Sequence, residues 1–262
     1  MSEELVDIQA SGDDRGIPLR QVGLTQLSYP MDVWDQNNKR QTVLGRFKLT
    51  VDLPHDYKGT HMSRFVEALE QHRGEMSLEI MPELVDNLRN RLDAERAHVR
   101  VDFPYFIRKR APVSKAESSM RVDCWFVGDA EERDAQFTLG VSVPVLTLCP
   151  CSKAISARGA HCQRSSVRMS IRFRELVWIE ELVNVAEASA SAPIFPLLKR
   201  EDEKWITETS YDNPRFVEDL AREVALRLRD DERILWFDVE VENEESIHTH
   251  NAFAAVGSDD LR

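Results

Sequence analysis

An α+β fold built on antiparallel sheets is predicted by three observations on this chain of 262 residues. Segments in which apolar and polar residues alternate occur in consecutive pairs, as half-buried strands do. Segments with apolar residues at helical spacing also occur in pairs. The order strand, strand, helix, helix, strand, strand occurs twice, so we expect two tandem ββααββ modules, residues 19–133 and 134–262.

The first module is expected to follow a loose arm of residues 1–18, which is polar and shows no periodic pattern. Alternating residues predict its strands, apolar residues at helical spacing predict its helices, and Pro82 suits a first helical turn. The expected elements, in order, are strands 22–29 and 43–53, helices near 65–69 and 84–92, and strands 99–107 and 121–128.

The second module repeats this pattern without visible sequence identity to the first. Pro144 lies within its first strand and would confine that strand to an edge or a bulge. Asn213 and Pro214 form a plausible helix start. The expected elements are strands 136–148 and 167–173, helices 175–188 and 216–228, and strands 235–242 and 252–256. Sheets of this kind leave open edges, which assembly of several copies can close.

Composition and charge limit the possible partners. The formal net charge of -12 argues against general nucleic-acid binding, although a local basic pocket could still hold a nucleotide. No apolar run approaches the length of a membrane span, and no secretory signal is visible. Four cysteines do not form a disulfide framework in a chain of this length, so we expect a cytoplasmic protein.

A thiol and an imidazole follow the end of the 136–148 strand, at Cys149 and His161. Together with a carboxylate such as Glu203, they form a ligand set for a borderline divalent ion, with a fourth position left open for water or substrate. Spacing alone leaves the alternative open that Cys149, Cys151 and Cys162 are small buried residues. A redox pair of Cys149 and Cys151 is disfavoured because active dithiols usually have Cys-x-x-Cys spacing. Cys124 has the position of a core residue.

Five motifs spread over residues 20–255 resemble the type IB GTP cyclohydrolases, which open the guanine ring of GTP at the entry to folate biosynthesis. They are Lys58-Gly-Thr-His-Met-Ser-Arg-Phe65, Leu148-Cys-Pro-Cys-Ser-Lys153, Leu198-Lys-Arg-Glu-Asp-Glu203, Asn213-Pro-Arg-Phe-Val-Glu-Asp219 and Glu245-Ser-Ile-His-Thr-His-Asn251. The resemblance implies a tunnelling fold (T-fold) of two ββααββ modules per chain, assembled as a homotetrameric barrel with active sites between subunits.

The resemblance also implies roles for individual residues. Cys149, His161 and Glu203 would bind one divalent metal ion, and the residue types do not choose among Zn²⁺, Mn²⁺ and Fe²⁺. Glu218 would bind the guanine edge, whose N1–H and 2-amino donors a carboxylate can accept as a pair. Glu245, His248 and His250 would surround the metal and the reacting ring, where imidazole suits proton transfer. On a continuing strand the two histidines would share one face.

The triphosphate requires donors, and two basic segments are candidates. His61, Ser63 and Arg64 belong to a segment at a predicted helix N-terminus, where backbone N–H groups favour anions. A plain helix cap by Thr60 is the competing interpretation. Lys153, close to Arg158, is the second candidate, and a solvated surface is its alternative.

The implied activity is metal-dependent conversion of GTP and water to formate and 7,8-dihydroneopterin triphosphate, without a redox cofactor. Two alternatives remain open at this stage. One is a nitrile reductase of the same fold that acts on a deazapurine with a cysteine nucleophile and NADPH. The other is a purine- or pterin-binding module that lacks catalysis.

Overall fold

The computed structural model describes residues 9, 11–72, 75–76, 80–131 and 134–261. The chain divides into two compact units. Unit 1 comprises Met1–Phe103 and Trp125–Thr138, and unit 2 comprises Pro104–Cys124 and Leu139–Arg262. The module boundary expected between residues 133 and 134 stays a prediction, because three long strands have residues in both units. These strands are β4 (Arg96–Arg110), β5 (Glu117–Glu131) and β6 (Asp134–Leu148).

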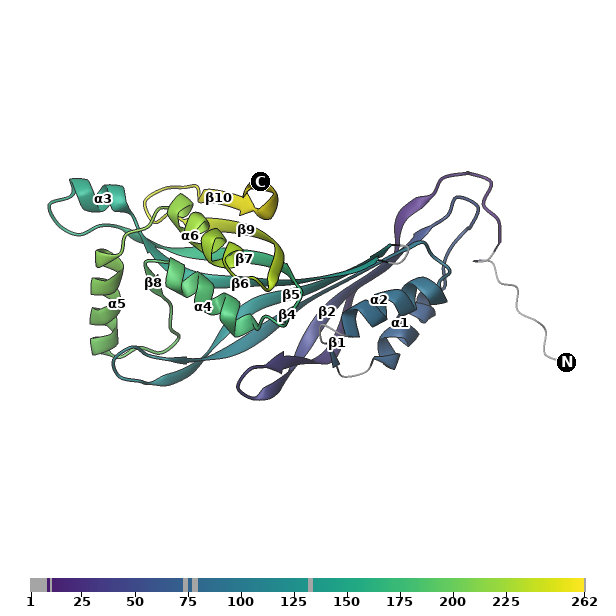
Figure 1. The fold of residues 1–262 in the computed structure, drawn as a ribbon, viewed down its shortest axis with the longest axis horizontal. Helices are drawn as coiled ribbons and strands as arrows, with labels where there is room; N and C mark the ends of the chain where they lie inside the picture. Colours follow the sequence, from purple (N-terminus) through teal and green to yellow (C-terminus); the bar gives the residue numbers. More distant parts are fainter. Residues whose placement is uncertain (1–8, 10, 73–74, 77–79, 132–133, 262) are drawn as a thin grey trace. The chain divides into compact units, whose positions relative to one another are not determined.

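Unit 1 is built on two long antiparallel strands and two helices that lie side by side (Figure 1). In the ladder, β2 lies between β1 and β4, and the short β3 pairs in parallel with β1. Its elements are β1 (Leu19–Asp35), β2 (Lys39–Leu53), α1 (Met62–Gln71), β3 (Glu75–Met76) and α2 (Ile80–Arg91), followed by the first part of β4.

The core of unit 1 follows the alternation of the sequence. Phe47 and Leu49 of β2 and Val99 and Val101 of β4 are fully buried, whereas Lys48 and Arg100 between them are not. The apolar faces of α1 and α2 are buried as well, at Phe65, Leu69, Leu84 and Leu88. Burial of one such side chain contributes about 1.5–3 kcal/mol, so this pattern fixes which face of the sheet the helices cover.

Unit 2 contains the antiparallel strand order β10-β9-β7-β6, with α4 and α6 packed beside each other. The first strand of that order, β10, lies at the edge of the sheet. The elements of unit 2 that follow β6 are α3 (Pro150–Ile155), β7 (Cys162–Phe173), α4 (Ile179–Ser189), β8 (Ala192–Pro193), α5 (Arg200–Asp212), α6 (Val217–Arg229), β9 (Ile234–Glu244), β10 (Ala252–Gly257) and a short 3₁₀ turn (Ser258–Leu261).

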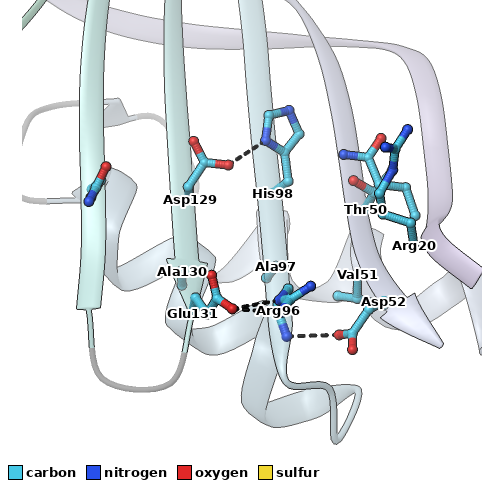
Figure 2. A pocket seen from close by; sticks show the side chains of 12 residues that line it. Arg20, Thr50, Val51, Asp52, Arg96, Ala97, His98, Asp129, Ala130 and Glu131 are labelled. Carbon is cyan, nitrogen blue, oxygen red and sulfur yellow. Dashed lines mark hydrogen bonds and ion pairs between the residues drawn. The ribbon is translucent and has the colours of Figure 1, made fainter. Parts of the chain in front are cut away.

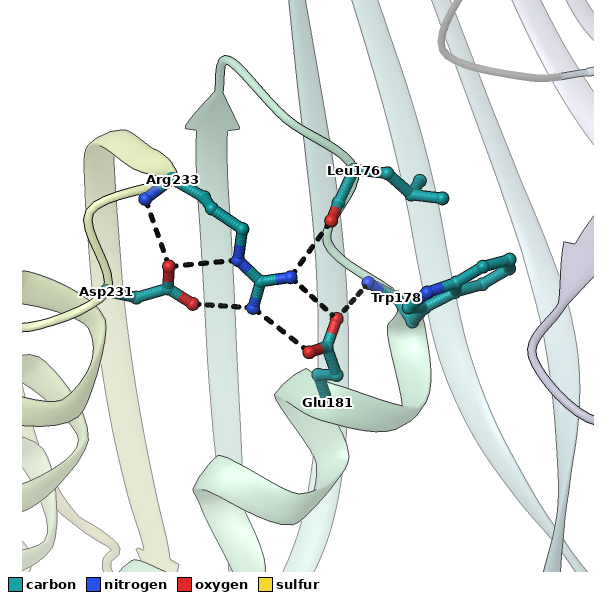
Figure 3. A network of polar contacts seen from close by, with 5 residues as sticks. All are labelled: Leu176, Trp178, Glu181, Asp231 and Arg233. Carbon is teal, nitrogen blue, oxygen red and sulfur yellow. Dashed lines mark hydrogen bonds and ion pairs between the residues drawn. The ribbon is translucent and has the colours of Figure 1, made fainter.

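An ion-pair network fixes the start of α4 against the turn before β9 (Figure 3). The Arg233 guanidinium donates to Glu181 at 3.0 Å, to Asp231 at 2.7 Å and to the Leu176 carbonyl at 3.0 Å. The Glu181 carboxylate also accepts from the Trp178 N–H at 2.8 Å. These bonds satisfy backbone groups at the helix N-terminus that have no partner within the helix.

The predicted strands and the four predicted helices are found, but the chain also forms elements that were not expected, among them the two-residue strands β3 and β8. Helix α5 lies between the two helices expected in the second module, and α3 lies between β6 and β7. The edge position expected at Pro144 is wrong, because β6 lies between β5 and β7, and its register with β7 is continuous from Leu139 to Leu148.

The predicted arm is attached at the positions that the structure describes. The Asp13 N–H donates to the Asp56 carbonyl at 3.1 Å, and the Lys58 N–H donates to the Ser11 carbonyl at 3.1 Å. Residues 1–8 and 10 of the arm lie outside the described residues. Among the helices of the described part, none is long and apolar enough to cross a membrane.

Candidate functional site

The turn between β6 and β7 brings Cys149 and His161 together. Strand β6 ends at Leu148, which lies directly opposite Cys162, the first residue of β7. The Cys149 N–H donates to the His161 carbonyl at 3.1 Å, so the antiparallel pairing continues one step beyond the strands. Two residues that are twelve positions apart in the sequence are therefore neighbours, as the predicted metal site requires.

Ser152 fixes this corner from the first turn of α3. Its Oγ donates to the Cys149 carbonyl at 3.1 Å and accepts from the His161 N–H at 3.2 Å. The Ser152 N–H points to the Cys149 Sγ at 3.5 Å, which gives the sulfur a donor suited to a thiolate. Cys149 is half-buried at the N-cap of α3, and Pro150 starts the helix.

Gln163 and Glu245 lie beside the Nδ1 of the His161 ring. The His161 Nδ1 lies 3.1 Å from the Gln163 Oε1 and 4.0 Å from the Glu245 Oε2. The Gln163 Nε2 donates to the Glu245 Oε1 at 3.4 Å. Sequence reasoning missed Gln163, although counting back in twos from the buried Val167 reaches Ser165 and Gln163 on the same face of β7.

The predicted carboxylates Glu203 and Glu218 are exposed, each in the first turn of a helix. Glu203 belongs to α5 and Glu218 to α6. In the part of the chain that the structure describes, no three His, Cys, Asp or Glu side chains are close enough together to hold a metal ion. His161 lies next to Cys149 through the backbone and 4.0 Å from Glu245, and the ligand role of Glu203 stays a prediction.

His248 and His250 lie in the turn between β9 and β10, and both are exposed. The expected strand does not continue to them, because β9 ends at Glu244. Their rings nevertheless stack, with centroids 5.1 Å apart and an interplanar angle of 21°. The His248 N–H donates to the Glu245 carbonyl at 3.4 Å, which connects this turn to the carboxylate beside His161.

The two expected phosphate-binding segments belong to different units. His61 in unit 1 is the N-cap of α1 and makes no side-chain cap bond, so the alternative of a cap by Thr60 is wrong. Ser63 and Arg64 are exposed in the first turn of α1, where Arg64 donates to the Arg91 carbonyl at 3.2 Å. In unit 2, Lys153 donates to the Tyr211 carbonyl and lies 4.3 Å from the centre of the Tyr211 ring.

Comparison of the sequence with known proteins decides the family. The family model described as type I GTP cyclohydrolase folE2 matches residues 5–254. The chain belongs to this family. The GTP cyclohydrolase FolE2 of Kosmotoga olearia is 54% identical over 250 residues, which cover 95% of this chain and 97% of that protein. The GTP cyclohydrolase FolE2 of Pseudothermotoga lettingae is 50% identical over 253 residues, covering 97% and 98%.

Solved structures similar to this GTP cyclohydrolase family member include uricases. The uricase from Bacillus fastidious matches with a TM-score of 0.56 at 7% identity, covering 95% of each chain. The uricase from Arthrobacter globiformis matches with a TM-score of 0.53 at 9% identity, covering 91% of this chain and 92% of that one. At these identities the similarity concerns the fold alone.

The described cysteines of this family member are all free thiols. Cys124 is 1% exposed, which confirms its predicted place in the core. Burial raises the pKa of its thiol well above the ordinary value, and the charges of Asp123 and Glu180 act in the same direction. Cys151 and Cys162 are exposed, so the alternative that they are buried core residues is wrong.

A separate cavity of about 330 Å³ lies in unit 1 of this GTP cyclohydrolase family member (Figure 2). Its charged groups pair with one another: His98 Nδ1 lies 2.7 Å from the Asp129 Oδ1, and Arg96 donates to Glu131 at 2.8 Å. The backbone N–H of Arg96 donates a hydrogen bond to the Asp52 Oδ1 at 2.8 Å. Since these pairs use most of the charged lining, the cavity offers little to recognise a ligand.

Proposed function

We propose that this chain converts GTP and water to formate and 7,8-dihydroneopterin triphosphate, the first step of tetrahydrofolate biosynthesis. The observation that carries the proposal is the family match over residues 5–254, and the position of His161 beside Cys149 and Glu245 in unit 2 supports it. Opening the guanine ring by hydrolysis requires an activated water and groups that move protons. At this corner, Cys149 and His161 would hold the ion that activates the water, and Glu245 is a group that can move protons.

One divalent metal ion, Zn²⁺, Mn²⁺ or Fe²⁺, is proposed to bind Cys149, His161 and Glu203. The thiol and imidazole donors fit such an ion by their chemistry, and the backbones of the half-buried Cys149 and His161 are hydrogen-bonded to each other. When bound, the ion would lower the pKa of its water and so supply a nucleophile at neutral pH. Glu203 completes the set only if its exposed carboxylate reaches this corner.

Substrate recognition is proposed to rest on Glu218, with Glu245, His248 and His250 beside the reacting ring. The Glu218 carboxylate is exposed in the first turn of α6. A charged carboxylate can accept both donors of the guanine edge. The imidazoles of His248 and His250, which stack on each other, would pass protons to the ring nitrogens. His61, Ser63, Arg64 and Lys153 are the proposed triphosphate donors.

Assembly is proposed to complete the site. The finer fold would be a tunnelling fold of two tandem modules, closed as a homotetrameric barrel with active sites between subunits in the cytoplasm. The fold similarity to uricases supports the architecture. The exposed edge strand β10, on which Phe253 is 61% exposed, supports pairing with a second copy.

Two competing functions remain testable. A deazapurine nitrile reductase of this fold would use Cys149 as a nucleophile and consume NADPH, and a binding module would turn over nothing. The high identity to proteins named GTP cyclohydrolase disfavours both. Protein purified without oxygen, with its metal measured, should release formate from GTP and yield a product that becomes fluorescent on oxidation.

Ligand variants test the metal proposal directly. Cys149→Ala and His161→Ala should each lose metal and activity together while staying folded, because neither side chain is part of the apolar core. Glu203→Ala should weaken metal binding. Cys162→Ala, which removes an exposed thiol from the neighbouring position, is the matched control and should keep both. Full metal occupancy and turnover in Cys149→Ala would move the site elsewhere.

A further inference from the structure

The His161 ring lies in a hydrogen-bonded chain that determines which of its nitrogens carries the proton. A neutral imidazole has one N–H and one bare nitrogen, and the partner of one nitrogen decides the state of the other. The partner of the Nδ1 is the Gln163 Oε1 or Nε2, depending on the orientation of the amide. The neighbour on the far side of Gln163 resolves this choice.

Glu245 fixes the orientation of the Gln163 amide. A carboxylate only accepts hydrogen bonds, so the Gln163 NH₂ group must face the Glu245 Oε1, which lies 3.4 Å from the Gln163 Nε2. The Gln163 Oε1 then faces the His161 Nδ1 at 3.1 Å. An oxygen can only accept, so the Nδ1 must donate. The reverse orientation would set the amide oxygen against the carboxylate and leave both without a donor.

Burial makes this choice costly to reverse. Gln163 is 5% exposed, and the His161 and Glu245 side chains are 16% and 14% exposed, so water cannot readily replace a lost partner. The strand register holds Gln163 in place, since it lies opposite Thr147 on β6 and next to Arg164, which lies opposite Glu244 on β9.

The backbone of His161 is fixed independently of its ring. Its N–H donates to the Ser152 Oγ and its carbonyl accepts from the Cys149 N–H. These bonds set where the residue lies, whereas the side-chain torsion and the protonated nitrogen are left to Gln163.

We propose that Gln163 is a positioning residue that holds His161 as the Nδ1–H tautomer and so leaves the Nε2 as its free lone pair. The inference deepens the proposed metal site by naming the ligand atom. It also places Glu245 on the Nδ1 side of the ring, where it orients the imidazole through Gln163 and does not share an ion with it. Histidine free in water favours the opposite tautomer, so the effect is measurable.

Nitrogen NMR of the metal-free protein with ¹⁵N-labelled histidine tests the inference without reference to turnover. The resonances of His161 are identified by their loss in His161→Gln. We expect a protonated Nδ1 and a bare Nε2 in the wild type. A neutral ring that is protonated at the Nε2 would overturn the proposal. A failure of the metal proposal would appear instead in the Cys149→Ala metal analysis, so the two failures are distinguishable.

Variants of Gln163 extend the test. Gln163→Leu should release the tautomer toward Nε2–H and weaken metal binding by about 10- to 100-fold, the range for partners that orient a ligand. Gln163→Glu combined with Glu245→Gln keeps an acceptor toward the Nδ1 and a donor between positions 163 and 245, and should restore the Nδ1–H tautomer. Ser165→Ala is the matched control, because Ser165 is equally buried on the same face of β7 but bonds to Thr147. An unchanged tautomer in Gln163→Leu would overturn the proposal.

Discussion

Single polar residues determine what the corner of unit 2 can do. The Ser152 hydroxyl hydrogen-bonds to the Cys149 carbonyl and to the His161 N–H. These bonds hold the backbones of both residues in place without help from a ligand. Gln163 then orients the ring. Preorganisation of this kind matters because a group held by its neighbours does not have to be ordered when substrate binds.

Glu218 offers the clearest test of substrate recognition at this scale. In Glu218→Gln one oxygen is replaced by an NH₂ group, which would face the donors of the guanine edge. Loss of a charge-assisted hydrogen-bonded pair costs roughly 1.5–3 kcal/mol, or about 10- to 150-fold in GTP affinity. Metal content should be unchanged. Glu223→Gln on the same helix is the control, and calorimetric titration with GTP is the measurement. Equal affinities for the two variants would reassign guanine recognition.

At the scale of elements, Asp202 connects α5 to the turn between β4 and β5. Its carboxylate is fully buried and accepts from the Val113 N–H at 2.8 Å, the Ser114 N–H at 2.9 Å, the Ser114 Oγ at 2.6 Å and the Lys199 N–H at 2.8 Å. Burial raises the pKa of this carboxyl, but the hydrogen bonds from Ser114, Lys199 and Val113 outweigh it and hold the pKa well below its usual range. Because Glu203 is the next residue, Asp202 sets where the proposed ligand lies.

Asp202→Ala should therefore lower the melting temperature, because several buried donors lose their partner at once. Asp202→Asn should fall between that variant and the wild type. A carboxyl whose pKa is depressed by folding stabilises the protein above its unfolded pKa of about 3.9. That contribution is lost as the pH falls through the lower folded value.

Melting curves at neutral and acid pH provide the measurement. The difference between the wild type and Asp202→Asn should be largest near neutrality and shrink below about pH 4. Glu201→Gln, an exposed change in the same helical turn, is the control. A difference that grew on acidification would contradict the assigned sign.

Whether an element could be predicted from the sequence depends on whether apolar burial or polar contacts stabilise it. The strands around Leu49 and Val141 and the helix around Leu220 were predictable because apolar burial imposes a period, and all three residues are buried. The buried residues of helix α5 are Asp202 and Ser210, both polar, so the sequence has no apolar stripe from which this helix could be predicted. It depends on a polar contact with a distant turn, which periodicity cannot show.

The site divides in the same way. The neighbourhood of Cys149 and His161 was predictable because a turn between paired strands returns the chain to the same place. The roles proposed for Glu203 and Glu218 come from the family motifs alone, because both side chains are exposed to solvent in the single chain. The stacking of His248 on His250 arises in a turn, whose geometry follows from neither strand nor helix spacing.

At the scale of the whole molecule, the distribution of proposed site residues points to assembly. His61, Ser63 and Arg64 belong to unit 1, whereas Cys149, His161 and Glu218 belong to unit 2. The strand order also ends in the exposed edge β10. An enzyme that completes its site across a subunit boundary would be inactive as a monomer.

Mixing two inactive variants tests that arrangement. Arg64→Glu should lack triphosphate binding and His161→Ala should lack metal. If a neighbouring chain supplies the Arg64 segment, random equal mixing leaves half of the chains intact at each position, so about one quarter of the sites should recover. Light scattering and mass spectrometry would establish that mixed oligomers form. A mixture of Cys149→Ala with His161→Ala is the control and should stay inactive, because both changes affect the same corner of one chain. A fully active monomer would defeat the idea, and proven mixed oligomers without recovery would assign both segments to a single chain.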